Sequence, residues 1–435
     1  MLQGSELTIT PIVDSFLETS YSWQINGEDI SNELTCTLPT IELGEYQVRF
    51  ATHNEDGDDE VTFKVEVCSP DQVDFNWTFL QTEYNMSAGR TIRIKPVDVN
   101  NALDAVYTWT VDNEQVQSGE NDTYLFTSEQ QGEHTVKVEM KNSYILATQT
   151  LKVNVCPPAG TYQRKISATS SASMNKVYEY LPAPGQFINE NHNTTTMAEA
   201  CTYAEERINQ TAYVSLGGFG GYIIVGFDHS IVNDGDYNIA ITGNAFDGSS
   251  EPGIVWVMQD ENGDGLPNDT WYELRGSEYG KAETWQDYAV TYHKPTGIQL
   301  PTPWTDNHGQ SGSIDYLGAF HRQDYYYPAW VKEKQYTLRG TRLKERNYDQ
   351  SGNGTYWVND SYEWGYADNF SAIDRLTDDD NYNAGPSDNH FKISHAVTFD
   401  GKDANLKYVD FIKVQVGVNT VSYTHLRAHE TRSNL

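Results

Sequence analysis

The sequence predicts an all-β protein made of two tandem immunoglobulin-like β-sandwiches, followed by a larger, jelly-roll-like β-sandwich with one short helix. Three observations support this fold class. The first third of the chain contains an internal repeat, most apolar segments alternate with period two, and one segment has helical spacing. The chain has 435 residues, which at roughly 100–200 residues per domain leaves room for two to four domains.

The composition argues against several classes of protein. Hydrophobic residues make up 38% of the chain and include 10 Trp, 29 Tyr and 15 Phe, enough to form packed cores and to exclude a wholly disordered chain. The formal net charge of -33 would repel phosphate backbones, which argues against nucleic-acid binding. The longest apolar run, residues 222–227, is far shorter than a membrane helix of roughly 20 residues, so we expect no membrane span.

The internal repeat has a period of 85 to 88 residues. Trp23 recurs as Trp109, and the sequences TFKVEV and TLKVNV lie near the end of each copy. Further matches, first copy then second, are Gly4 and Gly89, Leu7 and Ile92, Ile9 and Ile94, Tyr21 and Tyr107, and Cys68 and Cys156. Short alternating strands between Gly, Asn and Asp clusters predict antiparallel β-sandwiches at residues 1–68 and 71–156, with Trp23 and Trp109 as core anchors.

The order of motifs is the same in both copies: Y-x-W, then G-E-[YH]-x-V-[RK], then Asn, then a closing V-x-V-C. This order resembles the PKD-like, immunoglobulin-type modules of bacterial surface proteins. The resemblance covers about residues 4–156 and implies that the two modules are spacers or stalks that hold another domain away from the cell. The W-D-F-G-D signature of the better-known PKD repeats is absent, which leaves the exact subfamily open.

The four cysteines allow two interpretations. Cys36 and Cys68 could form a disulfide inside the first module in an oxidising compartment, or the cysteines could be free structural thiols. Tyr124 takes the position of Cys36 in the second copy, so such a bridge would not be repeated there. The chain has no C-x-x-C motif, so zinc and thioredoxin-type sites have no support.

Residues 159–420 predict one larger domain. Its helix is expected at residues 197–208, after the N-cap candidates Thr194 to Thr196. Strands are expected at residues 212–216, 222–228, 237–243, 253–258, 391–397 and 408–418. The GGFGG sequence between the first two strands predicts a tight hairpin. A mainly antiparallel sheet with long loops favours a jelly-roll-like sandwich.

This C-terminal region also resembles a known family. Its segments SLGGFGGYIIVGFDHSI, EPGIVWVMQDENGDGLPNDTWYEL and DNHFKISHAV resemble the C-terminal domain of PKD-like cell-surface lipoproteins of Gram-negative gut bacteria. The resemblance implies a location on the extracellular face of the outer membrane. Some members are encoded near outer-membrane uptake systems for corrinoids or glycans. The resemblance also implies a closing strand after the V-G-V-N stretch, which this sequence lacks.

Both ends of the sequence differ from its body. The N-terminal sequence MLQGSELTITP has neither the basic nor the apolar region of a signal peptide, so we expect an export signal and an anchor upstream of it. The alternative is a cytoplasmic protein. Residues 421–435 are net basic behind an acidic body and resemble the translated read-through of a sequencing adapter. We expect this tail to be non-native and leave it out of the functional argument.

One acidic segment has the spacing of a calcium-binding loop. The pattern D-x-N-x-D-G-x-x-x-D places hard oxygen ligands at alternate positions around a glycine turn. Position 12 of an EF-hand is Trp271 here, so the shorter loops of thrombospondin type-3 or dockerin-like repeats are the better comparison. The alternative is an ordinary acidic turn. The predicted ligands of a structural Ca²⁺ are Asp260, Asn262, Asp264, Leu266 (through its carbonyl), Asp269 and, as an offset substitute, Glu273.

Aromatic residues are concentrated in the loops between residues 304 and 364, among Asn, Gly and Asp. Exposed aromatic side chains with polar neighbours are suited to stacking on sugars or on flat ring ligands. The alternative is that these side chains pin long loops to the sandwich. The predicted ligand-binding residues are Tyr325, Tyr327, Trp330, Trp357 and Trp364.

Three functions fit these observations. The first is a surface binding protein, in which two stalk modules present a calcium-stabilised sandwich that captures an extracellular glycan or a corrinoid-type small molecule. The second is an extracellular glycan-active hydrolase, which would need a carboxylate pair about 5–10 Å apart in an aromatic cleft. The third is a structural or adhesive surface protein. We expect the first and assign no catalytic residue, because the sequence contains neither H-E-x-x-H nor G-x-S-x-G.

Overall fold

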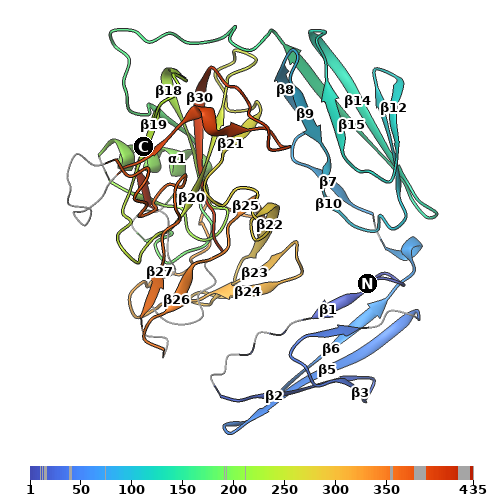
Figure 1. The fold of residues 1–435 in the computed structure, drawn as a ribbon. Coiled ribbons are helices and arrows are strands. Elements are labelled where there is room, and N and C mark those ends of the chain that lie inside the picture. The colour runs from blue at the N-terminus through green and yellow to red at the C-terminus, as the bar shows by residue number, and fades with distance from the viewer. Residues whose placement is uncertain are drawn as a thin grey trace. The chain divides into compact units, whose positions relative to one another are not determined.

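The structure is a computed structural model of the chain (Figure 1). It describes all residues except 10, 12, 14–16, 39–41, 74, 191, 193, 211, 353–355, 377–387, 420–431 and 435. The chain forms two compact units. The first comprises Met1–Tyr84, Thr91–Val155 and Gly309–Ser311, and the second comprises Asn85–Arg90, Cys156–His308 and Gly312–Leu435.

The first predicted module consists of antiparallel strands in two sheets. Its strands are β1 (Leu7–Ile9), β2 (Ser20–Ile25), β3 (Glu28–Ser31), β4 (Cys36–Leu38), β5 (Gly44–Asn54) and β6 (Gly57–Val67). One sheet has the order β3-β2-β5-β6, and β1 pairs with β4 in the other. Trp23 of β2 is fully buried and packs on Phe50 of β5, with ring centroids 4.6 Å apart. An aromatic core of this kind confirms the predicted anchor.

The second module begins after a short 3₁₀ helix, η1 (Pro70–Gln72). Its strands are β7 (Trp77–Phe79), β8 (Glu83–Ser87), β9 (Thr91–Ile94), β10 (Pro96–Val99), β11 (Val106–Val111), β12 (Glu114–Gly119), β13 (Tyr124–Thr127), β14 (Gly132–Lys141) and β15 (Leu146–Cys156). The main sheet has the order β12-β11-β14-β15-β8, and β13 pairs with β9 and β10 with β7. Trp109 of β11 is fully buried, as predicted.

Equivalent strand pairings in the two modules support the internal repeat. Ile9 pairs with Cys36 in the first module, and Ile94 pairs with Tyr124 in the second. Tyr124 therefore takes the structural place of Cys36, as the sequence alignment of the copies predicts. All four cysteines are free thiols in the structure, so the disulfide interpretation gains no support.

The described residues of the second unit form several antiparallel sheets and one α-helix. Its elements are β16 (Lys176–Leu181), α1 (Met197–Asn209), β17 (Val214–Ser215), β18 (Tyr222–Val232), β19 (Ile239–Gly243), β20 (Gly253–Met258), β21 (Trp271–Leu274), β22 (Trp285–His293), β23 (Thr302–Asp306), β24 (Ser311–Ile314), β25 (Gln335–Arg342), β26 (Asn347–Asp349), β27 (Trp357–Asn359), β28 (Asp388–Phe391), η2 (Ile393–His395), β29 (Ala396–Val397), β30 (Tyr408–Val416) and β31 (Arg432–Asn434). The sheet orders are β16-β18-β30-β20-β21-β29, β17-β31-β19-β28, β24-β23-β22-β25 and β26-β27.

The six-stranded sheet has one apolar face and one mixed face. Val225, Ile412 and Val257 pair across β18, β30 and β20 and are fully buried in the core. The neighbouring row on the other face contains Lys413 and Trp256. The Lys413 ammonium lies 4.9 Å from the centroid of the Trp256 ring. Side chains alternate along a strand, which gives the sheet these two faces. The sequence of this region, with continuous apolar runs such as residues 222–227, did not predict the division.

Some predicted elements differ from those observed. The predicted helix is confirmed as α1, whose N-cap Thr196 accepts a hydrogen bond from the backbone of Glu199. The predicted hairpin around GGFGG is wrong, because β18 pairs with β16 and β30 and not with β17. The predicted strand at residues 391–397 is divided into β28, η2 and β29, whose two strands belong to different sheets. Among the described residues, no helix is long and apolar enough to cross a membrane.

Candidate functional site

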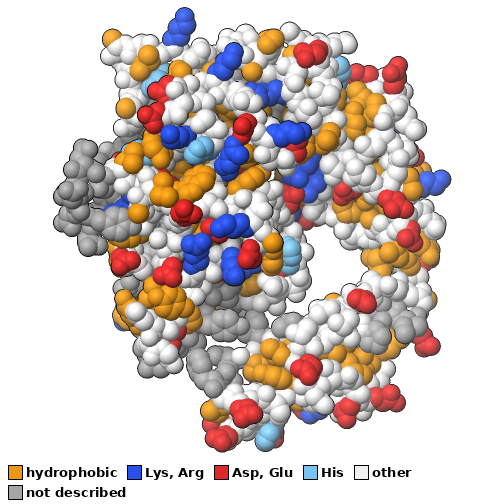
Figure 2. All heavy atoms as spheres, in the orientation of Figure 1, with side chains coloured by type: hydrophobic (Ala, Val, Ile, Leu, Met, Phe, Trp, Pro, Cys, Tyr) orange, Lys and Arg blue, Asp and Glu red, His pale blue; other side chains and the backbone are white. Residues whose placement is uncertain are grey.

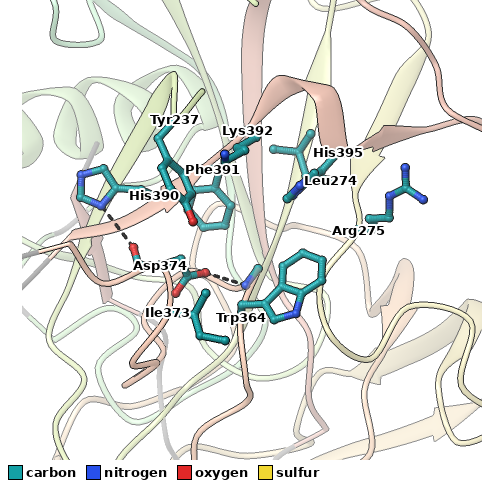
Figure 3. A pocket seen from close by; sticks show the side chains of 11 residues that line it. Tyr237, Leu274, Arg275, Trp364, Ile373, Asp374, His390, Phe391, Lys392 and His395 are labelled. Atoms are coloured by element: carbon teal, nitrogen blue, oxygen red, sulfur yellow. Dashed lines mark hydrogen bonds between the residues drawn. The ribbon is translucent and has the colours of Figure 1, made fainter. Parts of the chain in front are cut away.

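A cavity of about 270 Å³ opens in the second unit where β21, β28, η2 and the loop after β27 come together (Figure 3). Aromatic and basic side chains dominate its lining. The lining residues are Tyr237, Leu274, Arg275, Trp364, Gly365, Ile373, Asp374, His390, Phe391, Lys392 and His395. Concave sites with apolar walls and a few convergent polar groups are the usual form of small-ligand sites.

The loop that contains Trp364 is fixed to β28 through Asp374. The Asp374 carboxylate accepts a hydrogen bond from the backbone of Gly365 at 2.6 Å and one from the Asn389 amide at 3.3 Å. The backbone of His390 donates to the Asp374 carbonyl at 2.8 Å. Burial raises the pKa of Asp374, and these hydrogen bonds counteract the rise. Asp374 therefore positions the loop, and its oxygens already have protein partners (Figure 3).

Trp364 is held in place by its backbone. Its carbonyl accepts a hydrogen bond from the backbone of Ser277 at 3.0 Å. The next residue, Gly365, has a φ of +88°, and a Cβ there would lie 2.4 Å from the Cα of Gly276. Only glycine permits both this conformation and this close approach. The half-buried indole consequently faces the cavity and lies 5.2 Å from the ring of His395.

Two permanent cations lie in the lining, and both have exposed partners. Arg275 forms an ion pair with Asp403, whose side chain is 60% exposed. The Lys392 ammonium lies 3.6 Å from Asp236, which is 80% exposed, and 4.6 Å from the centroid of the Tyr237 ring. Such exposed pairs contribute only about 0–1 kcal/mol.

The two histidines add polar edges to the aromatic wall. Burial, and then the charges of Arg275 and Lys392, lower the pKa of His395, so this imidazole is neutral at neutral pH. The His390 ring lies 6.0 Å from that of Tyr237 in a T-shaped arrangement, and its Nδ1 lies 3.2 Å from the Asp374 carbonyl. The site can therefore offer aromatic faces, ring N–H groups and positive charge.

The structure brings only one of the predicted ligand-binding aromatics, Trp364, into this cavity. Tyr327 and Trp330 are 1% and 6% exposed and belong to the hydrophobic core. Tyr325 is half-buried and packs against that core, and Trp357 is half-buried at the start of β27. The burial of Tyr327 and Trp330 matches the alternative that aromatics pin loops to the sandwich, so we leave both out of the candidate site.

The predicted calcium loop is closed by its own hydrogen bonds. The Asp260 carboxylate accepts from the backbones of Gly263 at 2.7 Å and Gly265 at 3.0 Å. The Asp264 carboxylate accepts from the backbone of Leu266 and from the Asn262 side chain. Carboxylates that accept local backbone N–H groups form turns without an ion.

The remaining predicted ligands lie in different environments. Asp269 accepts a hydrogen bond from the backbone of Glu261, and burial raises the pKa of Asp269 to about 8. Glu273 accepts a hydrogen bond from the Thr341 hydroxyl of β25, and Leu266 is 47% exposed. In the described part of the chain, no group of three or more His, Cys, Asp or Glu side chains is placed to hold a metal ion. The oxygen donors are chemically suited to Ca²⁺, but their arrangement in the structure fits a calcium ion poorly. The calcium site therefore stays a prediction.

Most lining residues could not be identified from the sequence, because they lie in or beside strands rather than in aromatic loops. Tyr237 lies two residues before β19, Arg275 follows β21, and Lys392 and His395 lie in the break between β28 and β29. The one available signal was the presence of a Lys and a His within the predicted strand FKISHAV.

Comparison with known proteins supports the N-terminal assignment. The sequence model of the PKD-like domain matches residues 1–54 and 79–142. The fibronectin(III)-like modules of CbhA from Clostridium thermocellum align over 38% of this chain and 93% of theirs, with 16% identity and a TM-score of 0.19. The amphioxus IgVJ-C2 molecule aligns over 36% of this chain and 99% of its own, with 12% identity and a TM-score of 0.19. The immunoglobulin domains 1–5 of Sidekick-1 align over 81% of this chain and 58% of theirs, with 10% identity and a TM-score of 0.18.

Because these TM-scores are so low, we draw no conclusion about this chain from the solved structures. A search of curated proteins found no match. The PKD-like match and the antiparallel sheets indicate tandem immunoglobulin-like domains in an all-β protein. Domains of this type are typical of surface or adhesive proteins.

Proposed function

We propose that the second unit is the ligand-capture part of a cell-surface protein, and that it binds a small extracellular ligand in the cavity around Trp364. The observation that carries this proposal is the lining itself, in which aromatic and basic side chains from separate segments converge on one concave space. The PKD-like match supports a surface location, with the N-terminal modules as the stalk.

The size of the cavity favours a glycan over a corrinoid. At about 270 Å³ it is near the lower end of ligand sites, which span roughly 300–1,000 Å³. A terminal sugar has dimensions suited to such a space and can stack on the Trp364 indole. A corrinoid is much larger, so only one edge of it would enter.

The same lining favours binding over hydrolysis. Asp374 is the one carboxyl group among the described residues of the cavity wall, and its oxygens accept hydrogen bonds from Gly365 and Asn389. Glycoside hydrolysis usually requires two carboxyl groups on opposite sides of the scissile bond. We therefore do not propose the hydrolase alternative.

The resemblance of the C-terminal region to gut-bacterial surface lipoproteins supports the rest of the proposal. On this basis the protein lies on the extracellular face of the outer membrane and delivers its ligand to a neighbouring uptake system. Calcium bound at residues 260–269 would stabilise the second unit without touching the ligand. Capture does not depend on that ion, so the two parts of the proposal can be tested separately.

A glycan array and a titration with a corrinoid, both on the full chain, test the capture proposal. The best array ligand should bind Trp364→Ala about 5- to 150-fold more weakly, because aromatic anchors contribute about 1–3 kcal/mol. Tyr356→Ala is the matched control, since Tyr356 is 59% exposed and does not line the cavity. Equal weakening in both variants, or no glycan binding at all, would refute glycan capture at this cavity.

A further inference from the structure

We infer that the captured ligand carries an anionic group, and that the cavity takes a carboxylated sugar such as a hexuronate. This inference rests on the proposed function and specifies its substrate class. It starts from the permanent cations Arg275 and Lys392, which come from different segments of the second unit and line the same cavity.

The cavity lacks a counter-charge of its own that could satisfy both cations. Asp374 is the only carboxyl group among the described lining residues, and it is 2% exposed. Its oxygens accept hydrogen bonds from Gly365 and Asn389 rather than from Arg275 or Lys392. Each cation has its acidic partner outside the described lining, and a ligand anion would give both a partner inside the site.

The existing partners of these cations are easily replaced. Asp403 and Asp236 are 60% and 80% exposed, so water competes for both ion pairs. An Arg guanidinium binds a carboxylate through two parallel hydrogen bonds, which gives a ligand carboxylate an advantage over a single exposed Asp oxygen.

The charge distribution of the protein makes this local positive potential selective. The chain has a formal net charge of -33, so most of its surface repels anions. On the face shown in Figure 2, Lys and Arg side chains gather over the second unit, whereas Asp and Glu predominate over the first. An anion is therefore favoured only where basic side chains outnumber acidic ones, as they do in the cavity.

The aromatic wall indicates that the anion is attached to a sugar. Trp364 supplies a face for stacking, and the neutral His395 beside it offers a ring N–H or nitrogen to a hydroxyl group. A sugar ring that carries hydroxyl groups and one carboxylate would use the stacking face and the positive charge together. Free inorganic phosphate would use the cations but not the Trp364 face.

Calorimetry on the full chain tests the inference with two disaccharides that differ only in the terminal residue, glucuronate or glucose. The glucuronate probe should bind at least tenfold more tightly, and added salt should reduce the difference. Arg275→Gln and Lys392→Gln should each remove most of that preference, with thermal melts to confirm folding. Lys344→Gln is the matched control, because Lys344 is 68% exposed and outside the cavity.

Three outcomes would overturn the inference. If both probes bind equally and both depend on Trp364, the anionic preference is wrong while sugar capture stands. If inorganic phosphate displaces the acidic probe as well as free glucuronate does, the cavity recognises simple anions and not a sugar acid. If neither probe nor any array glycan binds, both the inference and the proposed function fail.

Discussion

Two aromatic segments of the second unit, residues 325–330 and 357–364, have similar compositions and different environments. Tyr327 and Trp330 are in the hydrophobic core, whereas Trp364 is half-buried and faces a cavity. The backbone explains the difference. The Asn189 side chain donates to the carbonyls of Tyr325 and Tyr327, and so fastens the first segment along its length.

The second segment is fastened at points that leave the indole of Trp364 at the cavity edge. Ser277 holds the Trp364 carbonyl, and Asp374 holds the backbone of Gly365. Aromatic composition therefore identifies loops whose side chains contact either the core or a ligand. The anchoring of the backbone determines which of the two they contact. Residues 325–330 are thus a packed region of the second unit, and the surroundings of Trp364 are an open region.

The largest effect is expected in the packed region. Trp330→Ala should lower the free energy of unfolding of the second unit by about 3–5 kcal/mol, because it removes a large side chain packed against Tyr180. Trp330→Phe should retain much of that stability. Chemical denaturation monitored by fluorescence measures both variants. A Trp330→Ala variant with unaltered stability and lost ligand binding would reverse the comparison.

A buried acid of β21, in the second unit, should make stability depend on pH. Burial raises the pKa of Glu273 to about 7, from an ordinary value of 4.5. Its contribution to folding is then fully present below about pH 4.5 and is lost as the pH rises through about 7, a change on the order of 3 kcal/mol. Glu273→Gln should flatten this part of the profile between pH 5 and 7.5.

The matched control for this profile is Glu283→Gln, since Glu283 has a side chain 58% exposed. Denaturation midpoints at each pH, taken for the native chain and both variants, give the comparison. If Glu273→Gln leaves the slope unchanged, or if stability rises with pH through this window because of Glu273, then its carboxylate is ionised in the folded state.

In the open region the effect should appear in binding rather than in stability. Trp364→Ala should change the free energy of unfolding by about 1 kcal/mol or less while it weakens ligand binding, because one face of the indole already lies in the cavity. The same denaturation series and the array ligand measure the two quantities. A loss of stability comparable to that of Trp330→Ala would show that both segments are core.

The smallest effect is expected from calcium. Because Asp260 and Asp264 already accept hydrogen bonds from their own loop, we expect weak binding and a stabilisation of about 1 kcal/mol or less at free calcium near the Kd. Calorimetric melts with calcium and with chelator, for the native chain and Asp264→Ala, measure this contribution. If calcium changes the free energy of unfolding by as much as Trp330→Ala does, the loop reorganises around the ion.

Local patterns in the sequence were enough to predict the tandem modules. Period-two alternation and the paired Tyr-x-Trp motifs depend on local spacing, and each Trp is buried within its own module, so the copy-to-copy match sufficed to predict the strands and the cores of both. The helix α1 was predictable for the same reason, because its N-cap and its apolar spacing are local signals.

The residues of the candidate site could not be identified without the tertiary structure. Tyr237, Arg275, Trp364 and Lys392 are far apart in the chain, and they meet because β28 pairs with β19 while β29 pairs with β21. The apolar alternation of FKISHAV satisfies a strand in either sheet, so the sequence pattern could not reveal that the chain changes sheets there. The burial of a side chain and the pairing of a strand depend on contacts between distant segments, which no local pattern encodes.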